Sequence, residues 1–259
     1  MSTLPESPLR DSTSFDPAQY DLPYSPGVER HFWHYARSRI VERHLRSTNP
    51  EIGRDAALVL DVGCGVGLTV EHLLHSGIDC RGVEVGRPSI RPGLENFVTI
   101  DTDARDLPLD LRRRTGTILL LDVIEHIEDP ISFIRNLRAN FPMLARILIT
   151  VPARMELWSN YDAYYRHFLR YDKRQIRVIA QRTDFDIIAL RYFFVGLYPI
   201  AWGLSHLFRH RWLATPPPSD LTAWIHRIAG LAFVVEERLP FVNLVPGTSL
   251  LAVLSARHS

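Results

Sequence analysis

Three glycines at alternate positions follow a short apolar run in the first quarter of the chain. The run covers residues 57–62, the glycines are Gly63, Gly65 and Gly67, and the residues after them have a helical pattern. A short apolar run that ends in glycines is typical of a buried strand. Glycines let the backbone turn tightly and let a ligand approach without a Cβ in the way, and the next helix presents free N–H groups. We therefore predict a strand, a ligand-binding turn and a helix.

Farther along, apolar runs alternate with segments of helical periodicity. The predicted strands are 57–62, 79–85, 97–100, 117–122, 145–151, 185–194 and 248–256. The main predicted helices between them are 67–76, 131–141 and 173–183. Strands separated by helices favour an α/β fold with a doubly wound, mostly parallel seven-stranded sheet. Ligands of such folds bind at the carboxyl ends of the strands.

Two regions lie outside this alternation. Residues 1–27 are rich in proline, and we predict a flexible N-terminal segment there. Residues 28–259 then form one domain, which begins with an amphipathic, aromatic helix over 28–47 that either packs on the domain or covers a pocket. The segment 196–247 is too long for a plain connection, so we predict a helical insertion that caps the substrate or binds a partner.

Composition narrows the classes of partner. The 259 residues include 30 basic and 29 acidic side chains, a net charge of +1, so nothing drives the whole molecule toward nucleic acid. The two cysteines cannot form a disulfide framework, and the N-terminus has no apolar core of signal-peptide length, so we expect a reducing, cytoplasmic location. Glycine, proline and histidine interrupt the uncharged stretch 192–208, so we expect no membrane span, and peripheral contact stays open. We interpret the arginines at 112–114 as a solvated loop.

Asp61, just ahead of the glycines, bears on the kind of ligand. A dinucleotide fingerprint requires a third glycine at position 68, which is Leu68 here. A carboxylate at position 61 would repel a pyrophosphate but would suit a ligand with a cationic amine. These residues favour S-adenosylmethionine (SAM) over NAD.

Four motifs then recur in order: the glycine loop, Gly-Val-Glu-Val over 82–85, Asp-Thr-Asp-Ala-Arg-Asp-Leu-Pro over 101–108, and Leu-Leu-Asp-Val-Ile-Glu-His over 120–126. With these motifs the chain resembles the class I SAM-dependent methyltransferases, over about residues 28–194. The resemblance implies a Rossmann-like fold, SAM as cofactor and methyl transfer as the activity.

The resemblance also implies individual roles. Glu84 is expected to hold the ribose hydroxyls and Asp103 the adenine amino group, with Asp101 and Asp106 as close rivals of Asp103. The full set of expected cofactor residues is Asp61, Gly63, Gly65, Gly67, Glu84, Asp103, Ala104 and Asp122.

The flanking segments resemble one subgroup, which includes ubiquinone-biosynthesis O-methyltransferases and bacterial glycan or natural-product methyltransferases. The similarity lies in the aromatic helix around Trp33 and Arg37, and in the residues after the fifth strand. The expected substrate-binding residues are Trp33, Tyr161, Arg170 and Tyr171.

Two histidines are candidates for a general base. His126 follows the fourth strand and His167 lies in the loop after the fifth, so both can face one acceptor, and we favour His126 slightly because it is anchored directly behind a strand. A pocket-shaping role for His126 and a structural pairing of His167 with Asp162 stay open. We expect no metal, because the neighbouring side chains of Glu125 and His126 should point in different directions.

The sequence thus predicts a SAM-dependent methyltransferase with a small-molecule acceptor. We favour O-methylation of a sugar-like or natural-product metabolite with a histidine base. N-methylation of a small amine and a non-catalytic SAM-binding protein remain alternatives, and the oligomeric state is left open.

Overall fold

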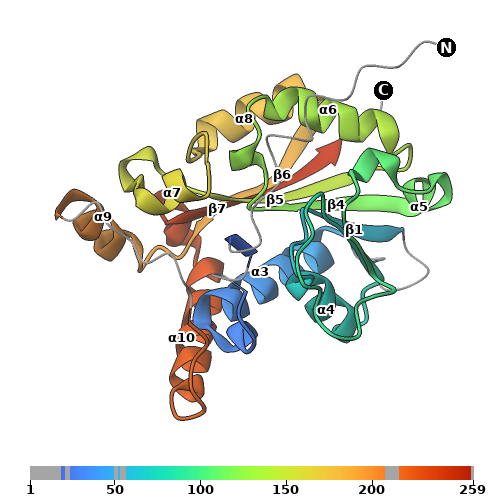
Figure 1. Ribbon diagram of the computed structural model, residues 1–259. Helices are drawn as coiled ribbons and strands as arrows, with labels where there is room; N and C mark the ends of the chain where they lie inside the picture. Colours follow the sequence, from blue (N-terminus) through green and yellow to red (C-terminus); the bar gives the residue numbers. More distant parts are fainter. Residues whose placement is uncertain (1–18, 21–23, 50–51, 53–56, 208–215, 258–259) are drawn as a thin grey trace.

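The computed structural model describes residues 19–20, 24–49, 52, 57–207 and 216–257. Seven strands form one sheet in the order β3-β2-β1-β4-β5-β7-β6 (Figure 1). The strands are β1 (Leu58–Val62), β2 (Cys80–Val83), β3 (Val98–Thr99), β4 (Thr115–Leu121), β5 (Arg146–Pro152), β6 (Phe185–Phe193) and β7 (Ser249–Ala256). β7 runs antiparallel to both of its neighbours, and the other pairs are parallel. The predicted α/β class with a mostly parallel seven-stranded sheet is confirmed.

Helices cover both faces of the sheet (Figure 1). One face packs against α5 (Leu109–Arg114), α6 (Pro130–Asn140) and α8 (Lys173–Arg182). The other face packs against α3 (Phe32–Thr48), α4 (Leu68–His75) and α10 (Ala223–Arg238). The remaining helical elements are η1 (Val28–Arg30), η2 (Ala104–Asp106), η3 (Ile124–His126), η4 (Met155–Leu157), α7 (Asn160–Tyr164), α9 (Tyr198–Leu207) and η5 (Pro240–Leu244).

The central strand β4 shows why the sheet needs two helical layers. All seven of its residues are buried. Ile118 and Leu120 pack into the core on the α6 and α8 side, whereas Leu119 and Leu121 pack on the α3 and α4 side. Successive side chains of a strand point to opposite faces, so a continuous apolar run of this kind requires cover on both.

Several element boundaries differ from the sequence-based expectation. The helix predicted over 28–47 is divided into η1 and α3 at His31, whose side chain accepts a hydrogen bond from the Trp33 N–H and caps α3. The interpretation of residues 112–114 as a loop was wrong, because these arginines form the last turn of α5. Cations are favourable at a helix C-terminus, where the carbonyl groups carry partial negative charge.

The prediction of a flexible segment over 1–27 falls largely outside the described residues. Within the part that is described, Tyr20 is buried and its hydroxyl lies against Glu84. The Tyr24 ring lies against Gly65 of the glycine loop. This end of the predicted segment therefore packs on the domain.

The segment predicted as a helical insertion contains α9 and α10. α10 packs along α3, and α9 contacts η4, in the connection that follows β5. Among the described residues, we find no helix with the length and apolar character needed to cross a membrane.

Candidate functional site

A pocket of about 310 Å³ opens at the carboxyl ends of β1, β2 and β4. Its position agrees with the rule for ligand sites in open α/β sheets. The predicted cofactor residues that line it are Gly63, Glu84, Asp103, Ala104 and Asp122. Asp61, Gly65 and Gly67 are not part of the lining. Asp61 lies within β1, and Gly65 and Gly67 lie in the turn between β1 and α4.

The loop between β1 and α4 needs glycine for steric reasons as well as for ligand access. At Gly63, φ is 76° and an added Cβ would lie 2.8 Å from Cγ2 of Val123, which itself lines the pocket. At Gly67, φ is 88° and an added Cβ would lie 2.7 Å from Cδ1 of Leu94. Residues with a side chain rarely adopt such φ values. The loop therefore holds its tight path only with glycine at these positions.

Glu84, directly after β2, ties the glycine loop to the second strand. Its Oε2 accepts the Gly65 N–H at 2.9 Å, and its Oε1 accepts the Gly86 N–H at 3.0 Å and the Tyr20 hydroxyl at 3.1 Å. A carboxylate oxygen can accept about two hydrogen bonds. Oε2 therefore retains the capacity to accept one more donor, such as a ribose hydroxyl.

Asp61 is a buried acid with an oxygen that lacks a partner. It is 2% exposed, and its Oδ1 has no hydrogen-bond partner in the described structure. Burial raises the pKa of Asp61 to about 7, while the nearby guanidinium of Arg37 acts in the opposite direction. A cationic ligand group beside Asp61 would stabilise its charged form, so the site suits a ligand with a positive charge.

The loop after β3 brings the rival aspartates to different places. Asp103 lines the pocket and forms a two-point ion pair with Arg105, at 2.8 and 2.9 Å. Asp101 also lines the pocket, but its carboxylate pairs with Arg87 on the surface. Asp106 is exposed and is not part of the lining. Asp101 and Asp103 therefore both lie in the pocket lining, and Asp106 does not.

Arg37 reaches from α3 into the site. It is buried, and its Nη2 lies 3.0 Å from Oδ2 of Asp122, which follows β4 in a left-handed backbone conformation with φ of 59°. The Arg37 guanidinium also lies over the Trp33 ring, 5.1 Å from its centroid. This ion pair connects the helical layer below the sheet to the rim of the pocket.

The two candidate histidines lie together. Their ring centroids are 4.6 Å apart, and only His126 lines the pocket. Burial, with His167 beside it, lowers the pKa of His126 to about 3. Nδ1 of His167 lies 2.9 Å from Oδ1 of Asp162. Burial alone would raise the pKa of Asp162, but its bonds to His167 and Arg170 hold it at about 2. The anionic carboxylate therefore orients the His167 ring.

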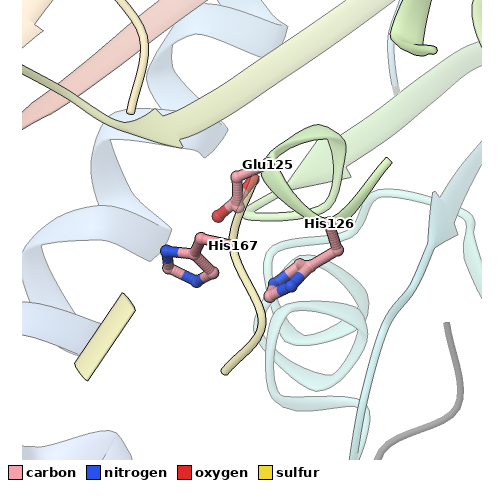
Figure 2. Close-up of side chains that lie close together, drawn as sticks. All are labelled: Glu125, His126 and His167. Carbon is pink, nitrogen blue, oxygen red and sulfur yellow. The ribbon is translucent and has the colours of Figure 1, made fainter. Parts of the chain in front are cut away.

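Glu125 joins the histidine pair (Figure 2). It is 1% exposed, burial raises its pKa well above the usual range, and its Oε2 has no partner in the described structure. One ligand atom from each of Glu125, His126 and His167 lies within 4.8 Å of the others. The expected divergence of the Glu125 and His126 side chains was wrong. These three residues are of the type that could hold a divalent cation.

The expected substrate residues lie outside the pocket lining. Trp33 stacks on Phe194, with ring centroids 6.0 Å apart. Arg170 is buried and donates to Asp162 at 2.8 Å, and Tyr171 is buried and donates to the Ile124 carbonyl at 2.9 Å. These contacts use the polar groups of Arg170 and Tyr171 to support the histidine loops. Tyr161 is half-buried, and its ring centroid lies 6.2 Å from that of His167.

Sequence reasoning missed Tyr20 and Tyr24, named Arg37 without giving it a role in the site, and weighed Glu125 only as a metal ligand. Arg37 carried a signal, since it lies one helical turn after Trp33 on an aromatic helix. The tyrosines carried none, because they lie in a proline-rich segment with no periodicity.

The fold and this pocket define the class of protein. The Methyltransferase domain family matches residues 32–190, which is more than half of the chain, so the chain belongs to this family. The resemblance identified from the four motifs is confirmed.

Individual relatives show how broad the family is. The chain is 32% identical over 117 residues to norajmaline N-methyltransferase of Rauvolfia serpentina, which is 39% of this chain and 39% of that relative. It is 25% identical over 168 residues to the mitochondrial ubiquinone biosynthesis O-methyltransferase of Arabidopsis thaliana, which is 56% of this chain and 52% of that relative. The matches therefore span about half or less of the relatives' own lengths.

Solved structures agree on the fold. Phosphoethanolamine N-methyltransferase 2 of Haemonchus contortus, in complex with SAM, is similar with a TM-score of 0.54 and 16% identity, over 93% of this chain and 56% of that chain. Geranyl diphosphate C-methyltransferase of Streptomyces coelicolor A3(2) is similar with a TM-score of 0.52 and 12% identity, over 93% and 88%. At these identities the likeness establishes the fold alone.

Proposed function

We propose that the protein is a SAM-dependent methyltransferase that acts on a small molecule. The observation that carries this proposal is the pocket at the carboxyl ends of β1, β2 and β4, which is lined by Gly63 of the glycine turn and by the strand-end carboxylate of Glu84. Asp61, a buried acid with an unpartnered oxygen, lies two residues before Gly63 in β1. Family membership and the SAM complex of a structural relative support it.

The residues of the pocket fit the parts of SAM. Glu84 would accept a ribose hydroxyl at Oε2, and Asp103 and Ala104 would contact the adenine. Asp61, which lies in β1 outside the pocket lining, would offset the positive charge of the amino acid end. SAM supplies an electrophilic methyl group on a sulfonium when bound, so the reactive chemistry belongs to the cofactor. The protein must orient the acceptor and exclude water.

His167 is the better candidate for the general base. Asp162 fixes the ring by accepting from Nδ1, which leaves Nε2 to take the proton of an acceptor hydroxyl. His126 lines the pocket, but its lowered pKa makes it a weak proton acceptor. In this proposal His126 shapes the site and His167 moves the proton.

We favour a hydroxyl acceptor of a sugar-like or natural-product metabolite. The histidine and aspartate pair supports this choice, because an amine acceptor would only need to be unprotonated and would not need a base. N-methylation of a small amine remains the second candidate, since a similar protein is named as an N-methyltransferase.

The test is methyl transfer from isotopically labelled SAM to a small-molecule extract, analysed by chromatography and mass spectrometry. The proposal predicts label on a small molecule, and much less label with H167A. The control is H75A, which removes an exposed histidine from α4. If the wild type binds SAM and labels no fraction, it is a non-catalytic binding protein. An N-methylated product would support the second candidate.

A further inference from the structure

The outer side of α10 is apolar along its length. Trp224, Ile225, Ile228, Leu231 and Val235 are all exposed. At about 3.6 residues per turn, these positions share an arc of roughly 120° around the helix. A helix in a globular protein normally shows polar residues on its solvent side, so this face needs a partner.

Both acids of α10 are engaged by other groups, and Glu236, which is half-buried, lies at the edge of the apolar arc about 20° beyond Ile225. Glu237 is buried and pairs with Arg43, His44 and Arg191. Glu236 accepts the N–H groups of residues 195 and 196. The charged side chains that remain exposed on this fully described helix are those of Arg227 and Arg238. They lie at one edge of the apolar arc, about 20–40° beyond Leu231.

α9 presents a second surface of the same kind. Ile200, Trp202, Leu204 and Leu207 are exposed, and the helix contains no charged residue. Leu207 at the end of α9 is 77% exposed. Leu221, which precedes α10, is 86% exposed and follows Asp220, an exposed acid that pairs with Arg30. Both helices project from the body of the domain (Figure 1).

We propose that α9 and α10 dock the protein on the surface of an anionic lipid bilayer. An amphipathic helix with Trp and aliphatic residues on one side and arginines beside them lies in the lipid interface, where the apolar side is buried and the cations meet phosphate groups. The absence of exposed acids on these two described helices matches the negative charge of such a surface.

A second copy of the chain fits this face less well. In a symmetric dimer the same patch meets itself. Arg227 and Arg238 would then face the same arginines, with no exposed acid on α9 or α10 to pair with them. A lipid headgroup supplies the missing anion.

The docking surface also contacts the site loops. The Tyr198 hydroxyl of α9 donates to Glu156 at 2.8 Å, and the Ser205 hydroxyl donates to the Leu157 carbonyl at 3.4 Å. Glu156 and Leu157 belong to η4, in the connection after β5 that also carries His167. Docking would bring this side of the site close to the lipid. The inference does not depend on methyl transfer.

The test is flotation of the full chain with vesicles of phosphatidylcholine, with and without phosphatidylglycerol. We expect the wild type to float with the mixed vesicles and to float much less with phosphatidylcholine alone. The double variant I228E/L231E should lose at least about tenfold in the bound fraction, because it places charge where apolar side chains enter the interface. The matched control, M143E/V178E, changes two exposed apolar residues elsewhere and should float like the wild type.

Two further measurements keep the proposal falsifiable. Brominated lipid should quench tryptophan fluorescence in the wild type, and W224F should reduce that quenching, so the readout does not depend on the fold of the double variant. The proposal is overturned if the wild type does not float at low salt, or if I228E/L231E floats as well as the control. It is also overturned if light scattering shows a lipid-free dimer that I228E/L231E converts to monomer, because the face then binds a second copy.

Discussion

Glu84 combines a structural and a binding role in one carboxylate. It fixes the glycine loop through Gly65 and the start of the next loop through Gly86, and it still has capacity at Oε2. The Tyr20 hydroxyl adds a contact from the N-terminal segment. The residue that would read the ribose is therefore held in place before the ligand arrives.

We predict that E84A weakens SAM binding at least about tenfold. A hydrogen bond to a charged group contributes about 1.5–3 kcal/mol, and loss of one such bond corresponds to about a factor of ten or more in affinity. Calorimetry measures the change. E128A is the control, since it removes an exposed acid after β4. Unchanged affinity in a folded E84A protein would exclude the ribose role.

The histidine pair gives a second prediction at this scale. H167A should lower kcat by about 10²–10⁴-fold with little change in SAM affinity, as expected for loss of a general base. D162N should lower kcat as well, because the ring loses its anionic partner. H126A should have the smaller effect on kcat.

The pH dependence distinguishes the two rings. A protonated imidazole cannot accept a proton, so the rate should fall as pH drops through the pKa of the base. Because the pKa of His126 is lowered to about 3, a rate that depends on His126 as the base should fall only near that pH, and an acid limb well above it would exclude His126 as the base. An acid limb near pH 3, or a large loss in H126A with none in H167A, would assign the base to His126.

At this scale the sequence predicted positions better than contacts. Glu84 and Gly63 were expected at a strand end and in a turn, which leave local patterns, and both line the pocket. The sequence did not predict that Arg170 pairs with Asp162, because only the folded loop brings the two side chains together. The unpartnered oxygens of Asp61 and Glu125 could not be predicted either, because they depend on how the folded chain buries these side chains.

At the scale of elements, α10 and α3 pack closely through a glycine. An added Cβ at Gly230 would lie 2.6 Å from Cδ1 of Tyr35 and 3.2 Å from the Phe32 carbonyl oxygen. Gly203 in α9 has no atom within 4 Å of the same position. Gly230 and Gly203 therefore allow the same glycine-to-alanine change to be compared at a packed and at an open position of the insertion.

We predict that G230A destabilises the protein by about 1–3 kcal/mol, since the extra methyl group forces α10 away from α3. G203A should be neutral or should stabilise by up to about 1 kcal/mol, because alanine favours the helix. Thermal and denaturant unfolding measure both. Equal effects in the two variants would contradict the close packing of α10 on α3.

Long periodic elements were predicted well, and short ones were not. The strands around β4 and the helices α6 and α8 follow clear patterns of apolar residues. The 3-10 turn η4 and the short helix α7 were missed, because a few residues show no period and their caps arise from local contacts such as the Ser159 and Asp162 capping box. These are the elements that place His167.

The expected cap over the pocket remains a proposal for the insertion. Among the described residues, those lining the pocket come from β1, β2, η2, η3, α6 and the loops next to them, and none from 196–207 or 216–247. The insertion contacts elements around the site through α9, which packs on η4, and through α10, which packs on α3. Absence of nucleic-acid binding and a cytoplasmic location likewise remain predictions from composition.

At the scale of the whole molecule, SAM should stabilise the fold, since the pocket exists only when β1, β2 and β4 are in register. At about 100 times its Kd, a ligand adds about 2.7 kcal/mol. For a chain of this size, that corresponds to a rise in Tm of roughly 5–10 °C. Thermal unfolding with SAM should show this rise, and E84A should show less of it. No rise at saturating SAM would contradict a ligand site built from these strands.

The most direct measurement of the central claim is calorimetric titration of SAM, S-adenosylhomocysteine and NADH into the full chain. The account predicts saturable binding of SAM and S-adenosylhomocysteine at one site, and no binding of NADH, because Asp61 and Leu68 do not suit a pyrophosphate. Saturable binding of NADH, or no binding of SAM, would contradict it.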